Sequence, residues 1–121
     1  MLTRDEVILH LAQIAVLSPK HYAFAVLLPS LVEVKSFNQQ FKARLCEVPV
    51  WLKPAVTYDT QKMITLNNGK IFFWCNPLSG KGQTLTKVYK SVMMTEKQTY
   101  DYTVSLRPCL RSDSDWIEFE G

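Results

Sequence analysis

Residues 22–33 decide the fold, and they read Tyr22-Ala23-Phe24-Ala25-Val26-Leu27-Leu28-Pro29-Ser30-Leu31-Val32-Glu33. The first seven form a continuous apolar run closed by a proline, which predicts a buried strand that is central and parallel to its neighbours. Ser30 and Glu33 then have the spacing of a capping box, which marks the start of a helix. A buried strand followed by a helix is the repeating unit of a layered α/β domain.

The residues before this stretch predict a first helix. Thr3 and Glu6 have the spacing of a capping box, and a mostly apolar segment runs from residue 7 to about residue 17, before Ser18-Pro19. Because apolar residues occur nearly all round this helix, we expect it to be buried on several sides. His10 is expected to be a core or boundary residue with a local partner.

The residues after this stretch predict a second helix and a hairpin. Apolar residues recur at helical spacing from Leu31 to Val48, and Pro49 ends the helix. Residues 56–58 read as a strand, and residues 63–66 and 71–74 flank Asn67-Asn68-Gly69, a strong hairpin signal. Residues 85–94 fit either a helix or a strand, and residues 100–106 alternate like a strand.

These elements predict the fold class and the domain organisation. We expect one α/β domain over residues 1–111, with a small mixed sheet, a β-hairpin and helices on at least one side. Residues 112–121 are expected to form an acidic aromatic segment, which is either a last strand or a tail that docks on a partner.

Charge is unevenly distributed along the chain. The net charge is +3, but residues 35–90 contain nine basic and two acidic residues, whereas residues 112–121 contain four acidic residues and no basic one. This asymmetry indicates a basic face for an anionic partner, or alternatively an ordinary solvated surface rich in lysine.

The basic residues are interleaved with aromatic ones, as in many nucleic-acid-binding surfaces. The candidate nucleic-acid-binding residues lie on or near the predicted hairpin: Lys62, Lys70, Lys81, Lys87 and Lys90. The aromatic residues beside them are Phe72, Phe73, Trp74 and Tyr89. For Phe72 and Trp74, which share one face of a strand, a place in the core is at least as well supported as a role in binding.

No motif for catalysis is evident in the sequence. The loop from Ser79 to Thr84 resembles a phosphate loop, but the first glycine of that motif is missing and Gly82 stands where a serine or threonine would hold magnesium. Cys46, Cys75 and Cys109 are far apart, which argues against a disulfide framework or a zinc site. We therefore expect a non-enzymatic protein with no cofactor and no bound metal.

Several segments together resemble one protein family. They are Pro49-Val50-Trp51-Leu52-Lys53-Pro54, then Ile64-Thr65-Leu66-Asn67-Asn68-Gly69-Lys70-Ile71, then Pro77 and Lys81-Gly82. With the preceding helix, strand and helix, they resemble the ATPase region of the large terminase of tailed phages, over about two-thirds of the chain.

The chain departs from that family where hydrolysis would occur. It has Met1-Leu2-Thr3-Arg4 where the phosphate loop would precede the first helix, and residues 85–98 contain one acidic residue where the metal-binding strand would lie. The resemblance therefore implies a cut-down relative without hydrolysis. It carries over only Lys81 with Gly82, as an element that faces DNA or another subunit.

The sequence favours a phage-type accessory or regulatory protein that binds nucleic acid, or a nucleic-acid-handling complex, through its basic hairpin. The first alternative is a protein-interaction module, such as an inhibitor of a host enzyme, whose C-terminal segment docks on its partner. The candidate partner-binding residues of that segment are Asp113, Asp115, Trp116 and Phe119. The second alternative is a degenerate nucleotide binder. The free cysteines and the absence of a membrane-spanning run predict a cytoplasmic protein.

Overall fold

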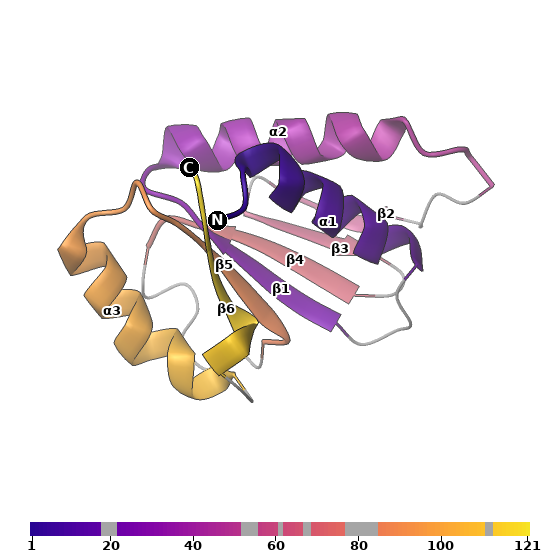
Figure 1. Cartoon of the computed structure of the whole chain (residues 1–121). Coiled ribbons are helices and arrows are strands. Elements are labelled where there is room, and N and C mark those ends of the chain that lie inside the picture. The colour runs from indigo at the N-terminus through magenta and orange to yellow at the C-terminus, as the bar shows by residue number, and fades with distance from the viewer. Residues whose placement is uncertain (18–21, 52–55, 61, 67–68, 77–84, 111–112) are drawn as a thin grey trace.

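The computed structural model covers the whole chain and describes residues 1–17, 22–51, 56–60, 62–66, 69–76, 85–110 and 113–121 (Figure 1). Its helices are α1 (Arg4–Leu17), α2 (Leu31–Cys46) and α3 (Glu96–Leu106). Its strands are β1 (Tyr22–Leu27), β2 (Val56–Asp59), β3 (Met63–Leu66), β4 (Gly69–Trp74), β5 (Lys87–Ser91) and β6 (Trp116–Phe119). The α/β fold class predicted from the sequence is confirmed.

The strands form one mixed sheet in the order β2-β3-β4-β1-β5-β6. The central strand, β1, is parallel to both β4 and β5, and β6 is parallel to β5. Strands β2 and β3 are added to the other side of β4 in antiparallel pairs. The prediction of a buried, central, parallel strand over residues 22–28 is therefore confirmed.

Helices cover both faces of the sheet. Helices α1 and α2 lie along one face, where their apolar side chains pack with Phe24, Val26 and Phe73. Helix α3 covers the other face, where Tyr102 and Leu106 pack with Leu27 and other strand residues. Because side chains alternate along a strand, β1 contributes to both cores.

The capping box of α1 is present as predicted. The Thr3 hydroxyl accepts a hydrogen bond from the backbone N–H of Glu6, and the Glu6 carboxylate accepts one from the backbone N–H of Thr3. The helix buries one face, whereas the side chain of Leu9 is 36% exposed and His10 is exposed. The expectations of burial on several sides and of a core or boundary histidine were therefore wrong.

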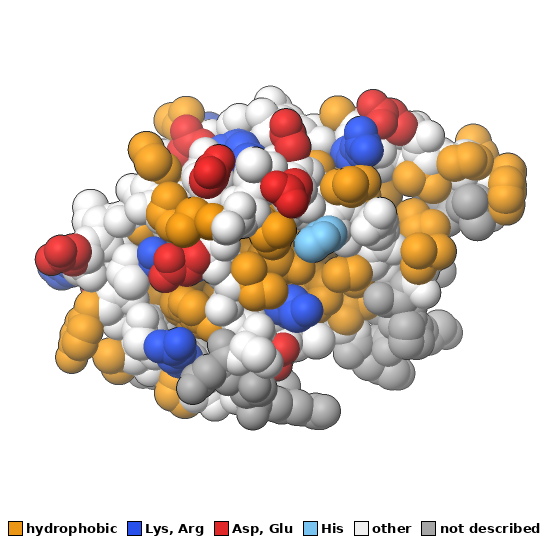
Figure 2. Space-filling model, in the orientation of Figure 1, with side chains coloured by type: hydrophobic (Ala, Val, Ile, Leu, Met, Phe, Trp, Pro, Cys, Tyr) orange, Lys and Arg blue, Asp and Glu red, His pale blue; other side chains and the backbone are white. Residues whose placement is uncertain are grey.

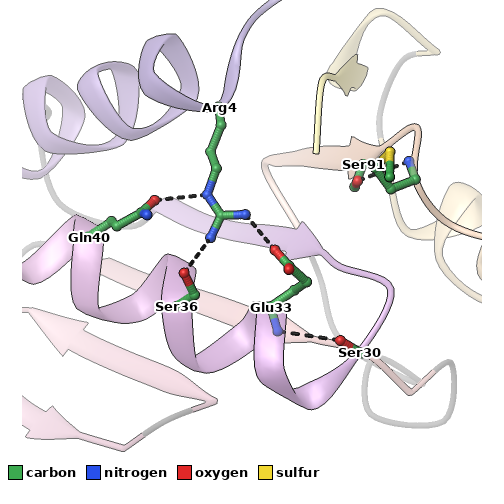
Figure 3. Close-up of polar contacts among 7 residues, drawn as sticks. Arg4, Ser30, Glu33, Ser36, Gln40 and Ser91 are labelled. Atoms are coloured by element: carbon green, nitrogen blue, oxygen red, sulfur yellow. Dashed lines mark hydrogen bonds and ion pairs between the residues drawn. The ribbon is translucent and has the colours of Figure 1, made fainter.

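At the start of α2 only half of the predicted capping box forms. The Ser30 hydroxyl accepts from the backbone N–H of Glu33, but the Glu33 carboxylate binds the guanidinium of Arg4 at 2.7 Å. Arg4 also donates to Gln40 at 2.8 Å and to Ser36 at 3.1 Å, so one side chain of α1 reaches three residues of α2 (Figure 3). This fork fixes how the two helices lie against each other.

The hairpin is confirmed, with Leu66 opposite Gly69 across β3 and β4; the two residues that join these strands lie outside the described residues. A side chain at Gly69 would begin 2.6 Å from the ring of Tyr22. The close approach of β1 therefore requires a glycine here, in addition to any demand of the turn.

The region after β4 differs in part from the prediction. Residues 87–91 form a strand, which settles the alternative that the sequence left open. Residues 100–106 belong to α3, so the predicted strand there was wrong. Thr95 and Gln98 form a full capping box, and Tyr102 and Leu106 are buried four residues apart. The cap and the burial of one helical face prevail over the local alternation.

The acidic C-terminal segment takes part in the sheet. Strand β6 pairs with β5 from Trp116 opposite Val88 to Phe119 opposite Ser91. Phe119 is fully buried in the core beneath α1 and α2. Of the two forms that the sequence allowed for residues 112–121, the structure therefore has the strand, which is the last strand of the same domain.

We predict that Arg4→Ala lowers the free energy of unfolding by about 1–2 kcal/mol, because three hydrogen bonds from a mostly buried guanidinium are lost. Arg4→Lys should recover only a small part of this loss, since an ammonium cannot form the planar fork. Urea denaturation measures the change. The control is Arg44→Ala, which breaks an exposed pair with Glu47; an equal loss there would contradict the role of the fork.

We predict that Tyr102→Phe raises the free energy of unfolding by about 1 kcal/mol at neutral pH, because its hydroxyl is buried without a hydrogen-bond partner among the described residues. Burial, with a smaller contribution from Cys75, raises the pKa of Tyr102 above its usual value of 10.0. The unfolded chain loses this proton above about pH 10 and the folded protein keeps it, so the wild type loses stability there and the variant loses less. Urea denaturation at neutral pH and above about pH 10 tests this prediction. The control is Tyr100→Phe at an exposed position, which should leave the free energy of unfolding unchanged at either pH.

Candidate functional site

The predicted nucleic-acid-binding lysines lie at both ends of the parallel strands. Lys70 and Lys87 lie where β4 and β5 begin, whereas Lys62, just before β3, and Lys90 lie at the opposite ends. Lys81 lies outside the described residues. The lysines that are close in sequence are thus separated along the sheet.

They are also divided between its two faces. The register pairs Lys70 with Ala23 and Lys90 with Leu27, which places both on the face that α3 covers. Lys87 pairs with Phe24 and so belongs to the opposite face. On the face that Figure 2 shows, acidic and basic side chains are interspersed. The described lysines therefore do not form one basic hairpin surface.

The aromatic residues beside these lysines are part of the core. Phe72 and Trp74 stack with their ring centroids 4.7 Å apart and are buried with α3. Of the two alternatives that the sequence analysis left open for them, the structure has the place in the core. Phe73 and Tyr89 are buried on the other face. None of the four is exposed for stacking on a base.

One smaller basic area remains along the flank of α2. Lys35 and Lys62 are exposed and form no ion pair among the described residues. Lys62 and Leu31 line the same small cavity, and helical spacing places Lys35 one turn after Leu31. Lys42, further along this stripe, is neutralised by Asp59 at 2.7 Å. The area with the exposed residues Lys35 and Lys62 is called the α2 flank below.

The predicted partner-binding residues of the C-terminal segment have different environments. Phe119 is fully buried, so its side chain is not available to bind a partner as the sequence analysis expected. Trp116 is partly buried, and the guanidinium of Arg107 lies over its ring, 5.6 Å from the centroid. Asp115 is partly buried, and the side chain of Asp113 lies outside the description.

Strand β6 forms one edge of the sheet, and part of that edge is open. The backbone N–H of Glu120 donates to the carbonyl of Leu2 at 2.8 Å, and Leu2 pairs with Phe119 in a single parallel bridge. No other described residue pairs with this side of β6. Open strand edges present unpaired backbone donors and acceptors to any extended segment that can reach them.

Two carboxylates line this open edge. The side chains of Glu118 and Glu120 are exposed, and neither forms an ion pair among the described residues. Lys90 lies opposite Glu118 in the register of β5 and β6, but its side chain is only 5% exposed. Because acidic side chains and unpaired backbone groups coincide, this acidic edge of β6 can recognise a basic extended segment. The sequence analysis counted these two residues in the charge of the segment, but did not include them among the candidate binding residues.

Among the described residues, chemistry-bearing side chains do not converge elsewhere. They contain no group of three or more histidine, cysteine, aspartate or glutamate side chains that could hold a metal ion. The cysteines are free, and the loop from Ser79 to Thr84 lies outside the description. A shallow groove of about 350 Å³ between the ends of α1 and α2 is lined mainly by apolar side chains such as Leu9 and Val48.

The sequence matches no known protein family and no curated protein. None of the helices in the described part of the chain is both long enough and apolar enough to cross a membrane.

Proposed function

We propose that this chain is a non-enzymatic interaction module that docks on a partner protein through the acidic edge of β6. The observation that supports this most is that the exposed carboxylates of Glu118 and Glu120 lie on an edge strand whose outer side pairs, among the described residues, only with Leu2. Charged groups at the rim of such an edge select partners and speed association. Inhibition of a host enzyme, one of the sequence-based alternatives, is one activity such docking would allow.

The supporting evidence for binding rather than catalysis is the arrangement of reactive side chains. His10 is exposed on α1, Cys46 is exposed at the end of α2, and Cys75 lies at the end of β4. A nucleophile needs a base within hydrogen-bonding reach, and no such pair occurs among the described histidine and cysteine residues.

A photo-crosslinking residue tests this docking in the cells that produce the protein. With the crosslinker in place of Glu120, we expect a covalent adduct to a partner protein, and the additional change Glu118→Lys should abolish it, because the edge would lose its acidic character. The control places the crosslinker at Val56, which is exposed on β2 at the other edge of the sheet. Adducts that form equally at position 56, or that survive Glu118→Lys, would contradict the proposal.

The second candidate function is binding of nucleic acid by a phage-type accessory protein, as the sequence favoured. It is supported by the α2 flank, where Lys35 and Lys62 are exposed and unneutralised. Two lysines make a small footprint, so this binding would be weak unless the segment with Lys81 adds to it. The resemblance to the terminase ATPase region stays a prediction.

Fluorescence anisotropy of a labelled DNA duplex and a labelled single strand tests this candidate. We expect Lys35→Glu with Lys62→Glu to weaken binding at low salt and to flatten its salt dependence, because fewer counterions are released from the phosphates. The control, matched in its change of charge, is Lys70→Glu with Lys97→Glu, which replaces two exposed lysines on β4 and α3. If both variants lost the same affinity for DNA, the binding would be a nonspecific attraction to positive charge and not a property of the α2 flank.

A further inference from the structure

We propose that the partner binds by adding a parallel strand to β6, and that this strand is an extended segment in which basic residues alternate with apolar ones. The inference rests on the docking proposed above and adds to it the binding mode and the chemistry of the partner. Strand addition of this kind draws affinity from main-chain hydrogen bonds and specificity from alternate side chains.

The backbone of β6 is oriented for such an addition. The carbonyl of Phe119 accepts from the N–H of Val92 at 3.0 Å, beside β5, whereas the N–H of Glu120 faces outward and donates to Leu2. Because backbone groups alternate in direction along a strand, the N–H and carbonyl of Glu118 also face outward. The bridge between Leu2 and Phe119 shows that this edge already accepts a parallel chain.

The side chains of β6 determine which positions of the added strand are apolar and which are basic. Ile117 pairs with Tyr89 and points, like Phe119, toward the core beneath α1 and α2. Glu118 points to the opposite face, and alternation places Glu120 there too. An added strand therefore needs apolar side chains beside Ile117 and Phe119, and lysine or arginine beside the two carboxylates.

The side chains of the N-terminal residues meet only the apolar half of this requirement. Leu2 lies beside Phe119, and the same register places Met1 beside Glu118 and Thr3 beside Glu120. Neither side chain carries a positive charge. Met1 is exposed, whereas Leu2 packs against the core beneath α1 and α2 and pairs with Phe119 in a single bridge. A basic segment that pairs along Trp116–Phe119 must therefore displace these two residues.

A second copy of the chain does not fit this edge. Two β6 strands that paired with each other would bring the carboxylates of both copies together without an opposing charge, and like charges across a strand pair are destabilising. Lys90 carries the nearest cationic side chain in the register, but it is buried behind the edge. Charge complementarity therefore favours a basic partner.

The probe for this inference is a synthetic peptide of alternating lysine and valine, titrated into the full chain labelled with ¹⁵N. We expect saturable binding, slowed exchange of the Glu118 amide hydrogen, and broadening near Glu120 from a nitroxide at the peptide's C-terminus. A peptide of alternating glutamate and valine is the charge control. A nitroxide effect that places the peptide antiparallel, or an unprotected Glu118 amide, would overturn the inference.

Three variants separate the contributions of backbone and charge. Glu118→Pro removes an outward N–H but leaves the bonds of Ile117 and Phe119 to β5, so we expect at least a tenfold loss of affinity. Glu118→Ala keeps the N–H and should cause a smaller loss with a weaker salt dependence. Leu2→Gly loosens the competing residues and should tighten binding.

The outcomes distinguish this inference from the docking on which it rests. If Glu118→Lys abolishes peptide binding while Glu118→Pro leaves it unchanged in a folded protein, strand addition is wrong and acidic docking stands. If no peptide binds, strand addition is overturned. The crosslinking experiment at position 120 then tests separately whether a partner protein docks on this edge. Should Glu118→Pro fail to fold, protection of the Glu118 amide in the wild type remains the deciding measurement.

Discussion

The rest of the structure depends on the burial of β1 on both faces and along both edges. Its backbone is paired with β4 and β5, and its side chains enter two cores. A strand in this position cannot leave polar groups unpaired, because an unsatisfied buried amide costs about 1–3 kcal/mol. The requirement places a paired strand on each side of β1. Both neighbours, β4 and β5, are parallel to it, and parallel pairing requires crossover connections.

The sequence predicted those elements whose determinants are local. The apolar run of β1, the capping box at Thr3 and the Asn-Gly hairpin each specify a structure within a few residues. Helix α3 was missed although Thr95 and Gln98 satisfy the same capping rule, because alternation over residues 100–106 was given more weight. The cap of α2 was predicted only in part, since the partner of Glu33 is Arg4, 29 residues away.

The candidate site was harder to predict, because charge that is clustered in sequence need not be clustered in space. Lys87 and Lys90 are three residues apart on one strand, which places them on opposite faces of the sheet. Phe72 and Trp74 follow the same rule but share a face, and that face is a core. Whether this face is buried depends on where α3 packs, and the sequence of the hairpin does not predict the position of α3.

Exposed carboxylates on an edge strand have a protective role as well as a recognition role. Charged side chains on such edges prevent like strands from pairing, which limits aggregation. At β6 the negative charge that disfavours a second copy of the chain attracts a strand of opposite charge. The same carboxylates can therefore both limit aggregation and select a partner. The parallel bridge at Leu2 supports this interpretation, because an edge that merely repelled neighbours would not hold one. The acidic edge of β6 thus disfavours pairing with a second copy of the chain and favours pairing with a basic strand.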